Sequence, residues 1–276
     1  MVKYGVIGDP YGISTGFDKL DEMTNGLQNA NLVIVSGESD MGKTAFALSI
    51  AKNIAAGQNI PMAFFSLEMS NVQLLNRFIS NACEIEGRKI LNGKLNKEDW
   101  ERLDKTLKTL IEVPLYIDDS EGLSVQDLKS KACCLARDKG IKLIMIDYLQ
   151  LMTISDISYN SRQKEIFFIL DSLKNLAKEL NIPILVLHQL DRGSELVKDY
   201  EVKRPQLSDI REYDAIEQNA DIVIFLHRPN YRRSYECEDG ANSYQEKIDV
   251  IIAKNHKGAT GIIQMDYEVA LSRIDN

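Results

Sequence analysis

The chain lacks the features that would place it in a membrane or in an oxidising compartment. No apolar run approaches the roughly 18 residues that a membrane-spanning helix needs. The N-terminus has no charged segment followed by an apolar one, the pattern that directs secretion. The few cysteines show neither a metal-ligand spacing nor a disulfide framework; they are Cys83, Cys133, Cys134 and Cys237. We therefore expect a cytoplasmic protein with no membrane partner.

Positive charge is also scarce. Lys and Arg number 33 against 41 Asp and Glu, which gives a net charge of −8 at pH 7. This balance argues against a broad, non-specific basic surface, so any polyanion must meet a restricted site. The chain also has no internal repeat, no low-complexity tract and no sharp domain break. Its 276 residues, 44% of them hydrophobic, can bury one large core.

One segment carries most of the chemical information. Residues 37–44 read G-E-S-D-M-G-K-T, a complete G-x-x-x-x-G-K-[ST] phosphate-binding loop. Gly37 and Gly42 let successive backbone N–H groups point at an anion. Lys43 supplies charge for the β- and γ-phosphates, and Thr44 supplies a hydroxyl for Mg²⁺ at the start of a helix. The predicted nucleotide-binding residues are Gly37, Glu38, Ser39, Asp40, Met41, Gly42, Lys43, Thr44 and Ala45.

Around this loop, apolar strands alternate with helical patterns. An apolar strand at 31–36 precedes the loop, and a helix at 45–56 follows it. Further strands are predicted at 61–67, 115–118, 141–146, 182–187, 222–226 and 248–253, with 261–267 completing a C-terminal β-hairpin. Further helices are predicted at 16–27, 71–86, 96–111, 125–139 and 162–180. The alternation predicts an α/β fold with a mostly parallel central sheet flanked by helices.

Polar side chains stand at the ends of three of these strands, where the working residues of parallel sheets lie. Asp147 closes the strand at 141–146 and suits a carboxylate that orients Mg²⁺. Glu68 follows a strand and can activate an attacking water, and Gln189 can contact the γ-phosphate through its amide. Taken singly, each is also compatible with an ordinary capping or loop residue. The nearby phosphate loop favours the catalytic interpretation.

Longer blocks of the chain resemble the motor domain of the DnaB-type replicative DNA helicases. The blocks, in order, are G-I-S-T-G-F-D-K-L-D-E-M-T-N-G-L, M-G-K-T-A-F-A-L-S-I-A, F-F-S-L-E-M-S, I-D-Y-L-Q-L-M, R-P-Q-L-S-D-I-R-E and A-I-E-Q-N-A-D-I-V-I-F-L-H-R-P. The resemblance implies a RecA-like P-loop NTPase domain at 16–276, preceded by a linker or arm at 1–15. The helical N-terminal domain of that family has no counterpart in these blocks.

The resemblance also implies roles for matching residues. Lys43 and Thr44 match the residues that bind the triphosphate and Mg²⁺, and Asp147 matches a Mg²⁺-associated aspartate. Glu68 matches the catalytic glutamate of the family. The catalytic candidates are therefore Glu68, Lys43 and Gln189, and the metal candidates are Thr44 and Asp147.

For DNA, the resemblance implies a role for the segment that follows Gln189. Arg192 falls where the family couples the γ-phosphate to the DNA-facing loop, and D-I-R-E falls where it meets the single-strand backbone. The predicted DNA-contacting residues are Arg192, Lys203, Arg204, Arg211 and Glu212. Asp214 stands where the family usually has a glycine that contributes a backbone amide. Basic and acidic residues alternate here, so we expect a sequence-independent grip by a few oriented groups.

The C-terminal strand departs from the family pattern. The family usually has Lys-x-Arg there, with the arginine reaching into the ATP site of a neighbouring subunit. In I-I-A-K-N-H-K, Lys254 matches the lysine and His256 occupies the place of the arginine. Arginine fingers contribute about 10³–10⁵ in rate, and a histidine of ordinary pKa is mostly neutral at pH 7. We hypothesise that Lys254, with His256 or Lys257, acts in trans.

These observations favour an ATP-dependent DNA helicase motor that moves on single-stranded DNA and unwinds forked duplex during replication. One alternative is a RecA-like ATPase that responds to single strands without processive unwinding. Another is a regulator that uses the fold to occupy a replication partner. The resemblance implies ATP and Mg²⁺ as cofactors, a ring hexamer that is weak without the N-terminal domain, and primase and a helicase loader as partners.

Overall fold

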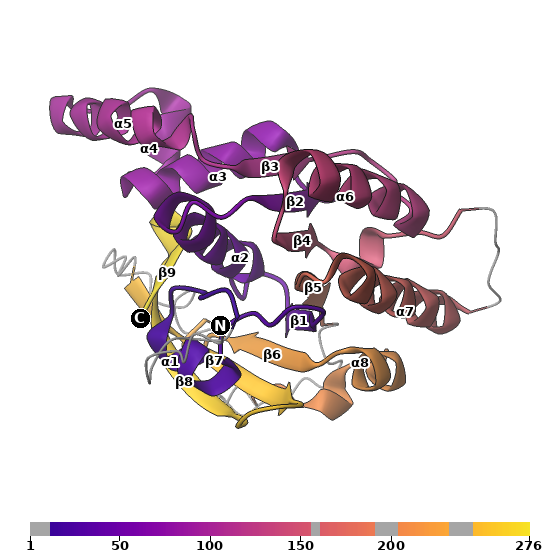
Figure 1. The fold of residues 1–276 in the computed structure, drawn as a ribbon. Coiled ribbons are helices and arrows are strands. Elements are labelled where there is room, and N and C mark those ends of the chain that lie inside the picture. The colour runs from indigo at the N-terminus through magenta and orange to yellow at the C-terminus, as the bar shows by residue number, and fades with distance from the viewer. Residues whose placement is uncertain (1–11, 156–160, 191–203, 232–244) are drawn as a thin grey trace, which may run out of the picture.

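The computed structural model describes residues 12–155, 161–190, 204–231 and 245–276, which build one nine-stranded sheet (Figure 1). The strands are β1 (Leu32–Gly37), β2 (Met62–Ser66), β3 (Leu115–Asp118), β4 (Leu143–Asp147), β5 (Ile184–Gln189), β6 (Ile222–His227), β7 (Gln245–Asn255), β8 (Gly261–Glu268) and β9 (Arg273–Asp275). Their order across the sheet is β3-β2-β4-β5-β1-β6-β7-β8-β9. Strands β3 to β6 in this order run parallel, and β7, β8 and β9 continue the sheet antiparallel. The predicted α/β class is confirmed.

Helices cover both faces of the parallel part. They are α1 (Asp18–Thr24), α2 (Lys43–Ala51), α3 (Asn71–Cys83), α4 (Gly87–Asn92), α5 (Lys97–Leu110), α6 (Val125–Lys139), α7 (Arg162–Leu180) and α8 (Tyr213–Asn219). In β1, Val33 and Val35 belong to the apolar cluster that includes α2 and α3. Leu32 and Ile34 belong to the cluster under α6, α7 and α8. Because alternate residues of a strand face opposite ways, the sheet separates two cores. Figure 1 shows α2 on one side of the sheet and α6 and α7 on the other.

Several boundaries differ from the predicted ones for identifiable reasons. Helix α2 begins at Lys43, and the chain continues as a π-helical turn at Lys52–Gly57 instead of one helix to residue 56. Strand β5 begins at Ile184 because Pro183 has no N–H to donate to the ladder. Helices α4 and α8 and strand β9 were not predicted, since each is too short to show a periodic pattern. The predicted C-terminal hairpin is confirmed as β7 and β8.

The described end of the predicted arm is tied to its own domain. Ile13 N–H donates to the carbonyl of Leu27 at 3.0 Å, and Leu27 N–H donates back at 2.8 Å. The amide of Asn53 donates to the carbonyl of Thr15 at 3.1 Å. Residues 1–11 of this arm lie outside the described residues.

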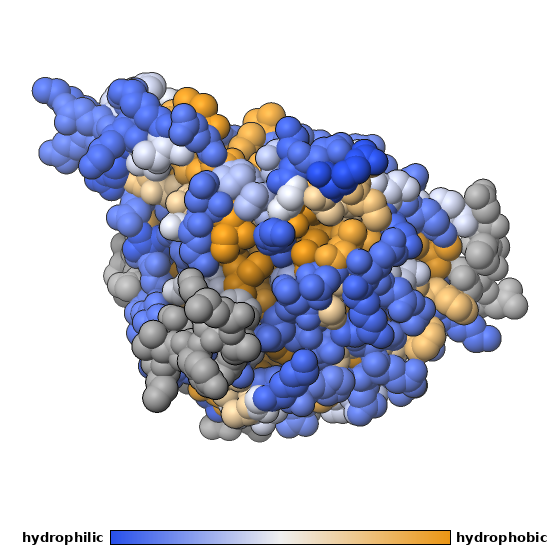
Figure 2. All heavy atoms as spheres, in the orientation of Figure 1, coloured by the Kyte–Doolittle hydropathy of each residue, from blue (hydrophilic) through white to orange (hydrophobic). Residues whose placement is uncertain are grey.

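The face drawn in Figure 2 is dominated by hydrophilic residues, with smaller apolar areas among them. An apolar groove of about 210 Å³ lies between α3, α5 and the edge strand β3, and Phe78, Leu107 and Ile117 contribute to its lining. None of the described helices is both long enough and apolar enough to cross a membrane.

Candidate nucleotide-binding site and trans-acting face

The register of the parallel strands brings the predicted strand-end residues to one edge of the sheet. Gly37 at the end of β1 pairs with Gln189 at the end of β5. Ser66 at the end of β2 pairs with Asp147 at the end of β4, and Leu67 N–H donates to the carbonyl of Asp147 at 2.7 Å. Four strands that are distant in sequence therefore end beside the phosphate loop. This is the edge at which α/β sheets bind ligands.

The loop has the backbone that a phosphate cradle requires. Gly42 has φ +88°, and an added Cβ would lie 3.2 Å from the ring of Tyr267, so the position requires glycine on both counts. Lys43 begins α2, and its Nζ donates to the carbonyls of Gly37 at 3.0 Å and Glu38 at 2.8 Å. Burial lowers the pKa of Lys43, and nearby carboxylates partly offset this lowering. The cationic group is thus held inside the loop that would enclose a phosphate.

A hydroxyl and a carboxylate meet beside this loop. Thr44 Oγ1 donates to Asp147 Oδ2 at 2.8 Å, and Asp147 is almost fully buried. Burial raises the pKa of Asp147 and the charge of Glu68 adds to this effect, while the hydrogen bond from Thr44 opposes it; the resulting pKa is about 6. A buried carboxylate that is costly to ionise gains from a bound cation.

This pair of oxygen donors fits Mg²⁺, which takes few protein ligands and shares its remaining positions with water and phosphate oxygens. The described residues contain no cluster of three or more His, Cys, Asp or Glu side chains that could hold a metal alone. A cation at Thr44 and Asp147 would therefore depend on the nucleotide, as in P-loop NTPases.

The other two catalytic candidates also lie at this edge. Glu68 is exposed just beyond β2, close enough for its charge to act on Lys43 and Asp147. Gln189 Nε2 donates to Ser39 Oγ in the phosphate loop at 3.1 Å. The amide proposed to sense the γ-phosphate therefore contacts the loop itself.

Two residues of this edge were not singled out from the sequence. Gln150 exchanges hydrogen bonds with the backbone of Gln189, accepting at 3.2 Å and donating at 2.7 Å. Arg228, at the end of β6, donates to the carbonyl of Asp40 at 2.6 Å and pairs with Glu246 at 2.7 Å. Its only signal in the sequence is a charged residue directly after an apolar strand. These contacts fix the strand that holds Gln189 and the tip of the phosphate loop.

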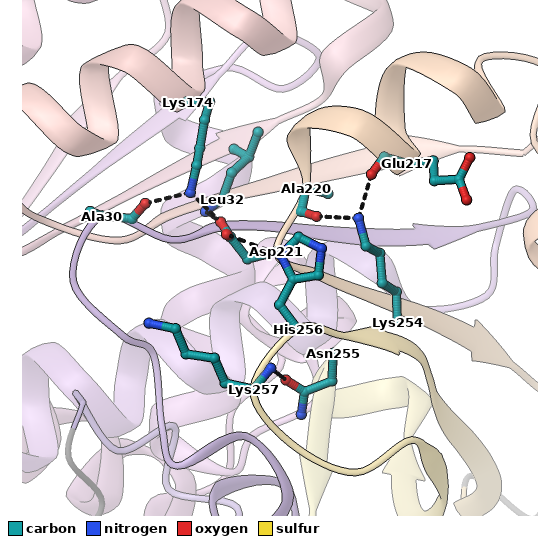
Figure 3. A network of polar contacts seen from close by, with 10 residues as sticks. All are labelled: Ala30, Leu32, Lys174, Glu217, Ala220, Asp221, Lys254, Asn255, His256 and Lys257. Atoms are coloured by element: carbon teal, nitrogen blue, oxygen red, sulfur yellow. Dashed lines mark hydrogen bonds and ion pairs between the residues drawn. The ribbon is translucent and has the colours of Figure 1, made fainter.

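The three trans-acting candidates, drawn in Figure 3, lie at the other ends of the strands from the phosphate loop. Because β7 is antiparallel to β6, its last residue, Asn255, pairs with the first residue of β6, Ile222. Lys254, His256 and Lys257 therefore lie near the amino ends of the parallel strands, whereas the phosphate loop lies at their carboxyl ends.

Two of these candidates are engaged within their own chain. Lys254 Nζ donates to the carbonyls of Ala220, at 2.7 Å, and Glu217, both at the C-terminal end of α8. Burial lowers the pKa of Lys254, which the charge of Asp221 opposes. His256 Nδ1 lies 3.7 Å from Asp221 Oδ1. Asp221 also pairs with Lys174 at 2.5 Å and accepts from Leu32 N–H at 2.7 Å.

Lys257 differs from its two neighbours. It is exposed, and its side chain extends away from α8 in Figure 3, while its N–H donates to Asn255 Oδ1 at 3.2 Å. Of the three candidates, Lys257 has the side chain least engaged by the described part of its own chain.

The family of DnaB-like helicase C-terminal domains matches residues 12–276. The chain belongs to this family. It is 43% identical over 260 residues to the replicative DNA helicase DnaB of Geobacillus stearothermophilus, with 94% of this chain and 55% of that protein covered. It is 42% identical over 261 residues to a probable replicative DNA helicase of Trieres chinensis, with 93% and 55% covered. This DnaB-like domain thus spans about half the length of these curated relatives.

Solved structures agree with this assignment. One solved ATPase domain superposes with a TM-score of 0.86 at 34% identity, covering 98% of this chain and 92% of that one. A DnaB-like replicative helicase, from a study of its interactions with primase, gives the same TM-score and identity, covering 98% and 63%. The RecA-like fold and the family expected from the sequence are confirmed.

The predicted DNA-contacting residues of this DnaB-like domain have different surroundings. Arg192 and Lys203 lie outside the described residues. Arg204 Nε pairs with the buried Asp249 at 3.0 Å, although the arginine side chain is 57% exposed. Arg211 is exposed, whereas Glu212 turns inward, with Oε2 3.3 Å from His188 Nε2. Their role at DNA stays a prediction, and Glu212 has a partner within the protein.

Asp147→Asn is expected to stabilise the protein in the absence of metal and nucleotide above pH 6. The folded-state pKa of about 6 exceeds the ordinary 3.8, so ionisation of Asp147 costs stability as the pH rises through this window. About 2 pKa units at about 1.4 kcal/mol each give a gap on the order of 3 kcal/mol at pH 8. The gap should shrink towards pH 4.5. Urea unfolding with EDTA at both pH values measures it.

The matched control is Asp118→Asn. Burial opposes ionisation of Asp118 too, but hydrogen bonds from Lys131 and Ser120 leave its pKa lowered. This variant should therefore lose stability at pH 8. Equal urea midpoints for Asp147→Asn and wild type at pH 8 would contradict the assigned electrostatics.

Proposed function

We propose that this domain is an ATP-dependent DNA helicase motor that translocates on single-stranded DNA and unwinds the duplex during replication. The observation that carries the proposal is the meeting of Lys43, Thr44 and Asp147 around the phosphate loop, with Glu68 and Gln189 at the same edge. The curated relatives named above are replicative DNA helicases. Since the chain spans only 55% of each, their activity is carried over here as a proposal.

ATP is the substrate that fits this edge. Lys43 would exchange the carbonyls of Gly37 and Glu38 for the β- and γ-phosphates, while loop N–H groups bind phosphate oxygens. Thr44 and Asp147 would hold Mg²⁺, which when bound neutralises phosphate charge. Glu68 would orient the attacking water and accept its proton. These residues divide the work into binding, orientation and proton transfer.

A ring hexamer explains the separation between the phosphate loop and the trans-acting candidates. They lie at opposite ends of the sheet, so a head-to-tail contact would present Lys254, with His256 or Lys257, to the nucleotide of the next subunit. Lys254 would then release the carbonyls at the end of α8. Residues 1–15 would serve as a linker or arm to the domain at 16–276.

Single-stranded or forked DNA is the proposed polyanion, contacted by the segment at 191–212. Arg204 and Arg211 are exposed there, which suits backbone contacts that do not depend on sequence. Primase is the proposed partner to test first, because one similar solved structure concerns a DnaB-like helicase and primase. A helicase loader and a cytoplasmic location complete the proposal.

A second candidate is a DNA-dependent ATPase that does not unwind processively. The observation that favours it is His256 in place of an arginine, together with Lys254 bound to α8 of its own subunit. Strand displacement distinguishes the two functions, since both require hydrolysis but only the first separates strands.

Lys43→Ala and Glu68→Gln are expected to abolish unwinding of forked DNA through different steps. Lys43→Ala removes the cation of the phosphate site and should weaken binding of a fluorescent ATP analogue at least about 10-fold. Glu68→Gln should bind the analogue normally but hydrolyse ATP about 10²–10⁴-fold more slowly. ATPase and strand-displacement assays at matched ATP measure both steps.

Lys105→Ala is the control, because Lys105 is exposed on α5, away from this edge. It should behave as wild type in both assays. Hydrolysis by Glu68→Gln at the wild-type rate would contradict its assignment as the base.

Mixing two inactive variants tests whether Lys254 acts in trans. Glu68→Gln subunits keep Lys254, and Lys254→Ala subunits keep Glu68, so a mixed ring contains some complete sites between unlike neighbours. Random mixing at equal ratio should restore about a quarter of the sites, measured as DNA-stimulated ATPase. A mixture of Glu68→Gln with Lys43→Ala should restore none, because both residues belong to the same loop-bearing subunit.

Two results would contradict the trans assignment. The first is no recovery in the Glu68→Gln and Lys254→Ala mixture. The second is full DNA-stimulated ATPase in Lys254→Ala alone. His256→Ala and Lys257→Ala, assayed singly, show which of these two residues assists Lys254.

A further inference from the structure

Three largely buried polar side chains form a hydrogen-bonded chain between the strand ends beside the phosphate loop and the start of α8. His188 Nδ1 lies 2.8 Å from Ser36 Oγ, and His188 Nε2 lies 3.3 Å from Glu212 Oε2. Ser36 and His188 are 0% and 1% exposed, and the side chain of Glu212 is 15% exposed. The three residues come from β1, β5 and the residue that precedes α8. The proposed mechanism of hydrolysis uses none of them.

This hydrogen-bonded chain of side chains adjoins both the phosphate loop and the segment proposed to meet DNA. Ser36 and His188 are register partners on neighbouring parallel strands. Ser36 precedes Gly37, where the phosphate loop begins, and His188 precedes Gln189. At its other end Glu212 follows Arg211, in the segment proposed to meet DNA.

The hydrogen-bonded chain of Ser36, His188 and Glu212 nevertheless lies away from the proposed nucleotide site. In β1 and β5, Ile34 and Val186 belong to the core under α7 and α8. Ser36 and His188 are two residues further along each strand, so they face the same side. Helix α2 and the phosphate loop lie on the other side of the sheet. His188 therefore acts through other groups and does not touch substrate.

Hydrogen-bond chemistry fixes the orientation of the ring. The hydrogen bond from His188 lowers the pKa of Glu212, so its carboxylate is ionised near neutral pH and can only accept. Nε2 must then carry a proton, and in the neutral ring Nδ1 accepts from the hydroxyl of Ser36. Each buried polar atom in this chain has a partner, and moving one group alone would leave a partner unsatisfied.

We propose that His188 is a positioning residue that couples nucleotide occupancy of the phosphate loop to the placement of Glu212 and the adjoining DNA-facing segment. A shift at the ends of β1 and β5 moves Ser36 and His188 together, and His188 carries Glu212 with them. By linkage, DNA held at this segment favours the same arrangement of the strand ends. The inference rests on the proposed function, since it requires both ligands.

Two substitutions each retain one of the two hydrogen bonds of the His188 ring and remove the other. His188→Asn places a polar group near the position of Nδ1, so it retains the contact with Ser36 and loses Glu212. His188→Gln reaches the position of Nε2, so it retains Glu212 and loses Ser36. Either variant breaks the chain while leaving a polar side chain of similar length in the site.

The measurement is the affinity for fluorescent oligo(dT), with and without a non-hydrolysable ATP analogue. The ratio of the two affinities is the coupling factor, and both variants are expected to reduce it about 10-fold, within the usual range of allosteric coupling. Nucleotide affinity and basal ATPase without DNA should stay within about 2-fold of wild type, because His188 lies outside the nucleotide site.

Asn81→Ala is the control for a purely structural effect. Asn81 is fully buried and donates to Ser49 Oγ at 3.0 Å and to the carbonyl of Ser272 at 2.7 Å, far from α8 in the fold. It should lower the melting temperature and leave the coupling factor unchanged. Adding Ser36→Ala to His188→Asn should lower the coupling factor no further, because the effects of substitutions within one hydrogen-bonded network are not additive.

The outcomes separate the two proposals. A wild-type protein that binds no single strand, or no nucleotide, would overturn the proposed function and this inference with it. A wild-type coupling factor that both His188 variants preserve would overturn the inference alone. So would a loss of coupling in Asn81→Ala equal to that in the His188 variants.

Discussion

The alignment of strand ends is the constraint on which the site depends. Gly37 is paired with Gln189, and Ser66 with Asp147, so residues far apart in the chain share one edge. A shift of one residue in either pairing would turn the affected side chains to the other face of the sheet. The apolar residues of these strands, buried on both faces, hold the register. Packing of the core therefore sets the geometry of the chemistry.

Helix α8 connects regions that the sheet keeps apart. It is preceded by Glu212, bound to His188 near the nucleotide edge, and it ends at carbonyls that hold Lys254 at the opposite edge. Its Ala215 and Ile216 pack into the core under α7, so the helix is held against the sheet by apolar contacts. The segment from Glu212 to Ala220 thus contacts His188 of β5 at one end and the proposed trans-acting lysine at the other.

Local pattern predicted the parts of the site that depend on local structure. The phosphate loop is contiguous, and Asp147 and Gln189 end long apolar strands, so their common edge follows from parallel-sheet topology. Arg228, Gln150 and His188 escaped prediction because their partners lie on other strands and no spacing marks them. The inward turn of Glu212 was missed for the same reason. Helix α4 and strand β9 are held by tertiary contacts, such as Ile274 N–H donating to Ser49 Oγ at 3.0 Å.

The proposed trans role of Lys254 would give assembly a nucleotide dependence. In this structure its ammonium donates to carbonyls at the end of α8, and hydrogen bonds from charged donors are worth about 1.5–3 kcal/mol. Lys254 keeps its hydrogen bonds on leaving α8 only where another acceptor replaces those carbonyls. A triphosphate in a neighbouring subunit would offer such an acceptor, and charge-assisted bonds to phosphate are stronger than those to neutral carbonyls. The proposed subunit contact through Lys254 would therefore be favoured by bound nucleotide.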